Sequence, residues 1–255
     1  MIAIAFLAGL WTATLRAKRD PALRDSADKI ADVTLWLMIG AIRGARIVYV
    51  TTYWKEEFAD QPFSEVFMIQ HGGLVYYGGL IGAMLAGFIY ARWKKLPMWK
   101  VADVLAPSIA LGNIFGRVGC FLNGCCYGYP THLPWAVQFP NQSYAWYQQY
   151  QQGLVGKTGP SLPVHPTELY DAVNNVLLYL LLAWLFRRKK FDGQVFATYL
   201  VGYAITRTIM EYFRGDYPAD HIHYGLTPGM LVSIPILIVG LALGAVLSHS
   251  QKQQA

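Results

Sequence analysis

Seven long apolar stretches divide this chain and leave few folds open to it. They run approximately over residues 1–16, 33–54, 72–91, 101–118, 168–186, 193–213 and 228–247. A helix needs about 20 residues to cross the hydrocarbon core of a bilayer, so the first and fourth stretches are marginal in length. Only 14% of the 255 residues are charged, whereas a soluble domain has about 25%. The sequence therefore predicts an all-α integral membrane protein with seven transmembrane helices.

The lysines and arginines alternate between the loops. Fourteen of the 21 lie in the C-terminal tail and in the loops 16–30, 92–100 and 187–192, and four lie in the loops between these. Cytoplasmic loops carry such an excess, so we expect an extracytoplasmic N-terminus and a cytoplasmic C-terminus. The net charge of +6 is then an orientation signal with affinity for anionic lipid, and we expect no nucleic-acid partner. We expect one domain over 1–255, with 129–167 as a small extracytoplasmic arm.

Small residues four positions apart predict close packing between membrane helices. They form three series: Gly40 with Gly44, Gly78 with Gly82 and Ala86, and Gly79 with Ala83 and Gly87. For most of these glycines we expect plain helix packing.

Several charged side chains fall inside or at the ends of the apolar stretches, where each costs about 2.5–3.5 kcal/mol at mid-helix. Arg207 and Glu211 are four residues apart, so they share a helix face and can pair. Arg43 and Arg46 can snorkel or cap carbonyl groups. Together with Arg117, these arginines exceed the buried carboxylates that the stretches offer. The excess predicts a positive site for a phosphate, most readily that of a lipid headgroup.

Residues 112–128 hold five glycines, Arg117 and all three cysteines of the chain. Glycines let a ligand approach the backbone, so we expect a binding site here. The cysteines allow three interpretations: packing or an extracytoplasmic disulfide from Cys120 to Cys125 or Cys126, a catalytic thiol beside Arg117, or a metal or haem site. The histidines considered for such a site are His71, His132 and His165. The Cys-x4-Cys-Cys spacing fits no common zinc pattern, so we expect no metal and no cofactor. His221 and His223 are interpreted as part of an ordinary loop.

Six motifs in order give the chain a family resemblance. They are Ile39–Arg46, His71–Gly82, Gly116–Gly119 with Phe121–Gly124, His165–Tyr170, Gly202–Arg214 and Leu226–Pro235. Through them the chain resembles the bacterial prolipoprotein diacylglyceryl transferases along nearly its whole length. The resemblance implies a multi-pass enzyme of the bacterial cytoplasmic (inner) membrane, acting as a monomer. It implies transfer of diacylglyceryl from phosphatidylglycerol to the lipobox cysteine of a prolipoprotein signal peptide, with release of glycerol phosphate.

The resemblance also implies a set of site residues. Arg117 and Arg207 match the phosphate-handling arginines of the family, and Glu211 matches the carboxylate one turn away. We expect a catalytic set of Arg117, Arg207, Glu211, Tyr77, His165, Cys120 and Cys125. We expect a substrate-binding set of Arg46, Gly78, Gly79, Gly116, Gly119, Asn123, Gly128 and Arg214.

Three departures from the family pattern affect the proton-handling groups. Tyr77 stands where the family usually has His, and Cys120 and Cys125 stand where it has Asn and Glu. A tyrosine that precedes the first span in the family falls before Met1. Two alternatives therefore stay open: a diverged paralogue with another acceptor, and a redox or metal-binding membrane protein centred on the cysteines. A transporter fits less well, because the sequence shows no matched pair of broken helices.

Overall fold

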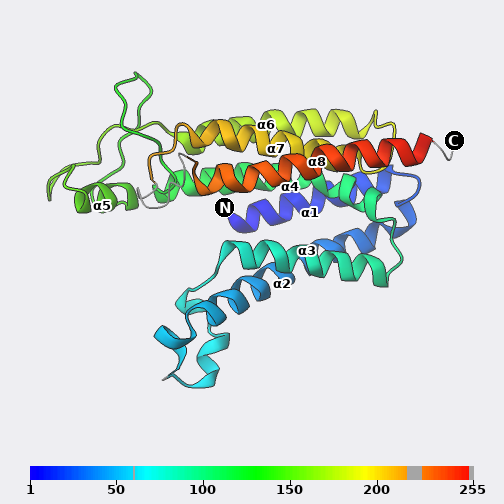
Figure 1. Ribbon diagram of the computed structural model, residues 1–255, viewed down its shortest axis with the longest axis horizontal. Helices are drawn as coiled ribbons and strands as arrows, with labels where there is room; N and C mark the ends of the chain where they lie inside the picture. The colour runs from blue at the N-terminus through cyan, green and yellow to red at the C-terminus, as the bar shows by residue number, and fades with distance from the viewer. Residues whose placement is uncertain (60, 217–225, 253–255) are drawn as a thin grey trace. The chain divides into compact units, whose positions relative to one another are not determined.

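The structure of the protein is a computed structural model that describes residues 1–59, 61–216 and 226–252. Each apolar stretch forms a helix (Figure 1). The long helices are α1 (Ile2–Arg19), α2 (Ala27–Thr52), α3 (Tyr76–Trp93), α4 (Met98–Asn123), α6 (Thr167–Phe186), α7 (Gln194–Glu211) and α8 (Pro228–Lys252). The short helices are α5 (Tyr144–Gln151), η1 (Arg24–Ser26), η2 (Trp54–Phe58), η3 (Phe63–Phe67) and η4 (Ile69–His71). In the described part of the chain, β structure is limited to isolated bridges.

Two helix boundaries differ from the apolar stretches, one for a local reason and one for a tertiary reason. Helix α3 begins at Tyr76 because Gly72 and Gly73 before it have φ of 90° and 78°, a conformation open mainly to glycine. Helix α4 continues to Asn123 through three glycines, since tertiary packing outweighs intrinsic helix propensity.

Among the residues that the structure describes, four segments are long and apolar enough to cross a membrane: Arg24–Thr52, Met98–Asn123, Thr167–Phe186 and Pro228–Ser250. Large apolar side chains cover their outer surfaces; on α6 these are Val173, Leu177, Leu180, Leu181 and Trp184. An exposed apolar helix face is stable in lipid and unstable in water. The chain is therefore a helical, multi-pass membrane protein.

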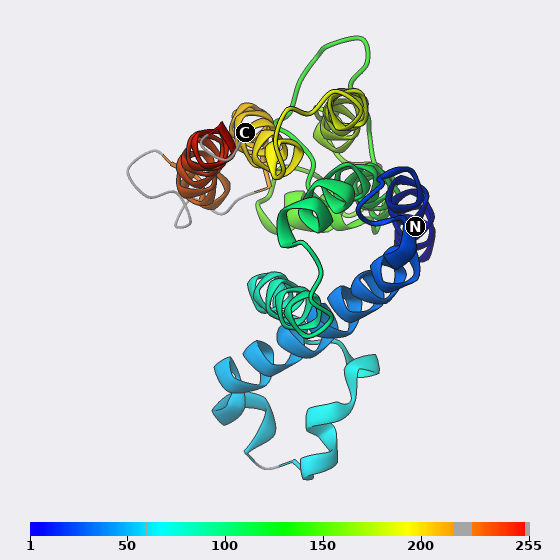
Figure 2. The same ribbon diagram turned by 90° about the vertical axis from the view of Figure 1, so that its right-hand side faces the viewer.

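The chain forms two compact units, residues 1–12 with 102–255 and residues 13–101. In the first unit, α6, α7 and α8 lie side by side and are seen nearly end-on in Figure 2. Its core contains Ala106, Ala110, Leu178, Leu182, Val195 and Tyr199. The buried carboxylate of Asp103 accepts hydrogen bonds from the backbone nitrogens of Gly193 (2.9 Å) and Phe196 (3.0 Å) and pairs with Lys189. Asp103 thus caps the start of α7 and fixes it against α4.

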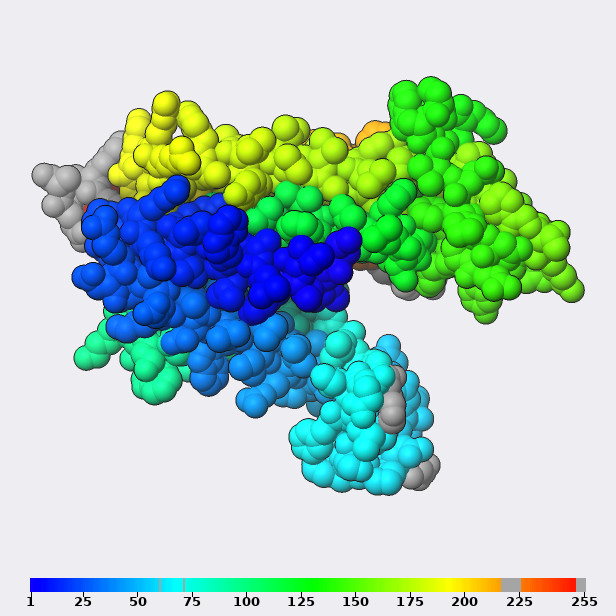
Figure 3. All heavy atoms as spheres, turned by 180° about the vertical axis from the view of Figure 1, so that it is seen from behind, coloured from blue at the N-terminus to red at the C-terminus, as the bar shows by residue number. Residues whose placement is uncertain are grey.

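The arm follows α4 and leads into α6 (green in Figure 3). Val164 forms isolated bridges to Pro130 and Val137. Tyr127, Phe139 and Ala145 pack with Val164 into a small core. The arm therefore has its own packed interior, and its extracytoplasmic location stays a prediction.

In the second unit, α2 and α3 pack along their glycines. A methyl group on Gly44 would overlap the carbonyl oxygen of Gly78, and one on Gly82 would overlap that of Gly40. The predicted close packing of membrane helices along these glycines is confirmed, with α2 and α3 as partners. Such contact maximises van der Waals packing, which drives helix association in lipid.

Replacing Gly82 with alanine is expected to destabilise the second unit by about 1–3 kcal/mol, because the added methyl meets backbone that has no room to move. Gly112 is the matched control, since nothing lies within 4 Å of a methyl group placed there. Gly112→Ala should raise stability by up to about 1 kcal/mol through helix propensity. Unfolding in detergent measures both variants. Equal effects in the two would contradict the packing argument.

Candidate active site

The candidate active site lies in the first unit, where the end of α4, the start of α6, the end of α7 and the start of α8 meet near the arm (Figure 1). The loop after α4 joins these elements through its backbone. The nitrogen of Gly128 donates to the carbonyl of His165 at 2.9 Å, and the nitrogen of Tyr129 donates to that of Phe213 at 3.0 Å. A methyl group on Gly128 would overlap the backbone of Phe213 and crowd His165. The predicted substrate-binding residue Gly128 therefore has a packing function, and substrate binding by it stays a prediction.

Arg207 and Glu211 form the predicted ion pair at the end of α7, with Nη2 and Oε1 2.5 Å apart. Glu211 also lies 3.5 Å from Nη1 of Arg214. Arg214 in turn holds Asp216 with two parallel hydrogen bonds of 2.8 Å. The backbone of Gly229 on α8 presses against the Glu211 carboxylate, where a methyl group would overlap it. These contacts fix the Arg207 and Arg214 guanidinium groups in place.

Arg117 near the end of α4 pairs with Asp171 on α6, with Nε and Oδ2 2.7 Å apart. The prediction that buried arginines outnumber buried carboxylates is therefore wrong for this unit. It failed because it left out Asp171, which long-range folding brings to Arg117, and Asp216, which pairs with Arg214 two residues before it. Arg117 nevertheless keeps binding capacity. Within the described residues its two terminal nitrogens have no hydrogen bond, and its side chain is 22% exposed.

Glu168 is a buried carboxylate that the predicted set did not include. It is 1% exposed, and among the described residues neither carboxylate oxygen has a hydrogen-bond partner. It lies within electrostatic range of Cys126, Asp216 and Arg117. Removing a carboxylate from water without a donor is costly, so Glu168 joins the candidate proton-handling groups of the site. Its sequence signal was an acidic residue directly after His165-Pro-Thr, in the first turn of an apolar helix.

His165, a predicted proton handler, lies beside this carboxylate in the sequence and is half-buried. Its Nδ1 is 3.2 Å from the hydroxyl of Tyr170, which also accepts a hydrogen bond from the indole of Trp135 at 2.7 Å. The rings of His165, Tyr170 and Phe213 pack edge to face. The imidazole is thus held in a defined orientation next to the candidate site.

The three cysteines come together at the end of α4. Their sulfur atoms all lie within 4.8 Å of one another, and all three thiols are free. The disulfide alternative is thus not what the structure shows. In the described part of the chain, the group contains no histidine ligand from His132 or His165. His221 and His223 lie outside the described residues, and the side chain of His71 is not described.

The thiols of the loop differ in acidity. The pKa of Cys126 is lowered to about 6, because the Cys120 thiol donates a hydrogen bond to its sulfur and Arg214 and Arg117 add positive charge. Burial raises the pKa of Cys125. The lowered pKa favours the thiolate form of Cys126, beside the guanidinium groups of the site.

The remaining predicted residues of this unit line the end of α4. A methyl group on Gly116 would meet nothing within 4 Å, so the backbone there is open to approach. Gly119 faces the Met1 side chain at 3.2 Å, and Asn123 is exposed at the last position of the helix. Substrate binding by these three residues stays a prediction.

Four predicted residues belong to the second unit. Tyr77 is 48% exposed in the first turn of α3, followed by the packing residues Gly78 and Gly79. The guanidinium of Arg46 donates to the carbonyl oxygens of Glu65 (2.6 Å), Val66 (2.8 Å), Gly72 (2.8 Å) and Gly73 (3.2 Å).

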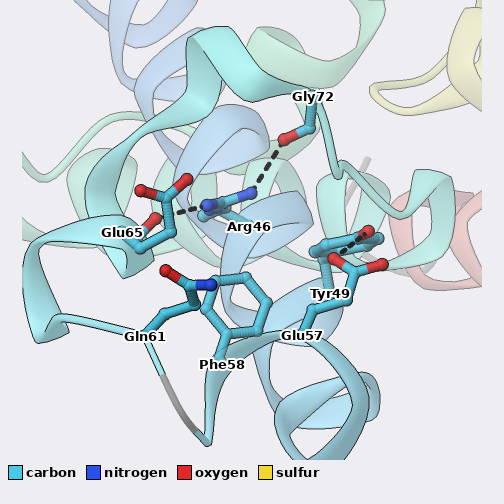
Figure 4. Close-up of a pocket in the computed structure, with 7 residues that line it drawn as sticks. All are labelled: Arg46, Tyr49, Glu57, Phe58, Gln61, Glu65 and Gly72. Atoms are coloured by element: carbon cyan, nitrogen blue, oxygen red, sulfur yellow. Dashed lines mark hydrogen bonds between the residues drawn. The ribbon is translucent and has the colours of Figure 1, made fainter.

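Arg46 lies on the wall of a cavity of about 370 Å³ (Figure 4). Phe58 and Tyr49 pack their rings against its guanidinium. Arg46 therefore holds the loop between α2 and α3 in place by capping carbonyl groups, which was the alternative to substrate binding. Substrate binding by Arg46 stays a prediction.

Comparison with known proteins decides the family. Residues 1–246 match the model of the family described as prolipoprotein diacylglyceryl transferase. The chain belongs to this family. Relatives named phosphatidylglycerol–prolipoprotein diacylglyceryl transferase include one from Shewanella oneidensis, 36% identical over 94% of this chain and 83% of the relative. Another, from Synechococcus elongatus, is 37% identical over 85% of this chain and 72% of the relative. A third, from Idiomarina loihiensis, is 33% identical over 89% of this chain and 79% of the relative.

In this family member, the structure thus brings part of the predicted set of site residues together at one site. The residues that meet there are Arg117, Cys120, Cys125, Gly128, His165, Arg207, Glu211 and Arg214. Arg46, Tyr77, Gly78 and Gly79 belong to the other compact unit.

Proposed function

We propose that this protein transfers the diacylglyceryl group of phosphatidylglycerol to the lipobox cysteine thiol of a prolipoprotein, which forms a thioether and releases glycerol phosphate. Relatives that align with this chain over most of their length are named for this activity. The observation that carries the proposal is the hydrogen bonding of the Arg117 guanidinium. Its Nε is fixed by Asp171, while its terminal nitrogens have no partner among the described residues. A guanidinium held in this way is oriented to receive a phosphate.

The arginines of the site bind the leaving phosphate. When the glyceryl carbon–oxygen bond breaks, negative charge grows on the phosphate oxygens, and fixed hydrogen-bond donors stabilise it. A guanidinium has five N–H donors, so one carboxylate partner leaves donors for a substrate. Arg117 supplies the accessible donors. Arg207 supplies a second positive group oriented by Glu211.

The acceptor thiol must lose its proton before it attacks carbon, since the thiolate is the nucleophile. Glu211 already lies against Arg207 and Arg214, which suits it to orienting them. Glu168 has no donor among the described residues and is the better proton acceptor. His165 and Tyr77 remain the other candidates.

Both substrates are amphipathic, which agrees with a site at the ends of membrane helices. We propose that all seven long helices span the bacterial cytoplasmic membrane, with the N-terminus and the arm outside. The 14 lysines and arginines on alternate loops support this orientation. We further propose that the protein acts as a monomer and that residues 1–255 form one catalytic domain.

The proposal is tested with purified protein in vesicles that contain phosphatidylglycerol. A lipobox peptide should gain a diacylglyceryl thioether, and the same peptide with serine in place of cysteine should not. Mass spectrometry detects the product, and glycerol phosphate should appear in equal amount. Consumption of phosphatidylglycerol without a peptide product would assign a different acceptor. Absence of both products in well-folded protein would contradict the transferase function.

A further inference from the structure

The three cysteines form a compact donor group that the proposed function does not yet use. We call Cys120, Cys125 and Cys126 the cysteine triad. Their sulfur atoms lie within 4.8 Å of one another, and each thiol is free and partly buried. One ion placed among them can contact all three sulfur atoms.

The backbone holds the triad in place from both sides. Cys120 lies in the last turn of α4, and the nitrogen of Cys125 donates to its carbonyl at 3.2 Å. Cys126 has φ of 70°, which is unfavourable for a residue with a side chain. The hydroxyl of Thr167 on α6 donates to the Cys126 carbonyl at 2.6 Å and retains this conformation. Strained residues kept by such contacts are concentrated at functional sites.

The donor set selects a class of ion. Thiolates favour zinc and monovalent copper over magnesium, calcium or manganese. Within the described residues the group has three members, all cysteines. A zinc site with three protein ligands keeps its fourth tetrahedral position for a water or a substrate. Three thiolates on a divalent ion leave one negative charge. Arg214, Asp216 and Arg117 all lie within electrostatic range of Cys126.

We propose that the cysteine triad binds one zinc ion through three thiolates and offers the fourth position to the acceptor thiol. The role in catalysis rests on the proposed transferase function. A thiol bound to zinc is deprotonated, and Glu168 takes up the proton. The thiolate then attacks the glyceryl carbon that carries the phosphate. The carbon–sulfur bond forms as the carbon–oxygen bond breaks, and the electron pair leaves on glycerol phosphate. The thioether product has no ionisable proton, binds zinc weakly and leaves.

Zinc binding is measured on the full chain in detergent, stripped of metal and kept reduced without oxygen. Titration with zinc chloride against a competing chelator should give one bound zinc per chain. Cys120→Ser, Cys125→Ser and Cys126→Ser should each weaken binding by about 100-fold or more, because each removes a metal ligand. His132→Ala is the matched control, because it removes an exposed imidazole outside the triad. This variant should bind zinc as the wild type does. Binding below about one tenth of an equivalent, or a triad disulfide trapped in intact cells, would overturn the proposal.

The fourth position is tested with cobalt in place of zinc, because thiolate–cobalt absorption reports the number of sulfur ligands. A lipobox cysteine peptide should strengthen this absorption, and the serine peptide should leave it unchanged. A cobalt absorption spectrum that does not change when the cysteine peptide is added would overturn the proposed role of the ion in thiol binding.

These readouts need no turnover, so they separate the two proposals. A peptide-sensitive cobalt site in a protein that makes no thioether would contradict the transferase function alone. Normal thioether formation by metal-stripped protein would contradict the zinc proposal alone.

Discussion

Replacing Arg117 with alanine is expected to lower the rate of thioether formation by about 100- to 1,000-fold, the usual loss when a fixed donor to a growing negative charge is removed. The variant removes the terminal nitrogens that have no partner among the described residues. Initial rates are measured with phosphatidylglycerol vesicles and a lipobox peptide. Gel filtration in detergent checks that the protein remains folded.

Two further variants make the Arg117 result interpretable. Arg117→Ala leaves Asp171, whose side chain is 10% exposed, without its ion partner. The double variant with Asp171→Asn removes this leftover charge, and it should fold well and stay inactive. Lys157→Ala removes an exposed positive charge of the arm and should retain the wild-type rate. Wild-type turnover in the double variant would exclude Arg117 from phosphate binding.

Replacing Glu168 with glutamine is expected to lower the rate at pH 7 by about 100-fold or more, the usual contribution of a general base. Glutamine keeps the size of the side chain but cannot accept the thiol proton. Because it also removes a buried ionisable group without donors among the described residues, stability should be unchanged or higher.

The pH profile distinguishes loss of a base from structural damage. The ordinary pKa of a cysteine thiol is about 8.5. Above that pH the acceptor thiol is already ionised, so it needs no base. The defect of Glu168→Gln should therefore shrink as the pH rises above about 8.5. A loss of the same size at every pH would point to a structural function for Glu168. A wild-type rate at pH 7 would assign the proton to another group, and His165→Gln is then the variant to measure.

Features that depend on local spacing could be predicted from the sequence. The apolar stretches located every long helix, because about 20 apolar residues in a row are stable only in lipid. The spacing of four residues placed Arg207 beside Glu211 on one helix face. The glycine series predicted close packing of membrane helices, and the structure identifies α2 and α3 as partners. The motif pattern identified the family, which the match over 1–246 confirmed.

The pairing of distant groups depends on long-range packing and could not be predicted from the sequence. Arg117 meets Asp171 from another helix, and Arg46 is enclosed by carbonyl groups of residues 65–73. The cysteine sulfur atoms meet because Cys126 takes a left-handed conformation that its side chain disfavours. Glu168 loses its contact with water only when the surrounding helices pack over it. Periodicity describes neighbours along one helix, whereas charge balance and burial depend on neighbours that are far apart in the chain.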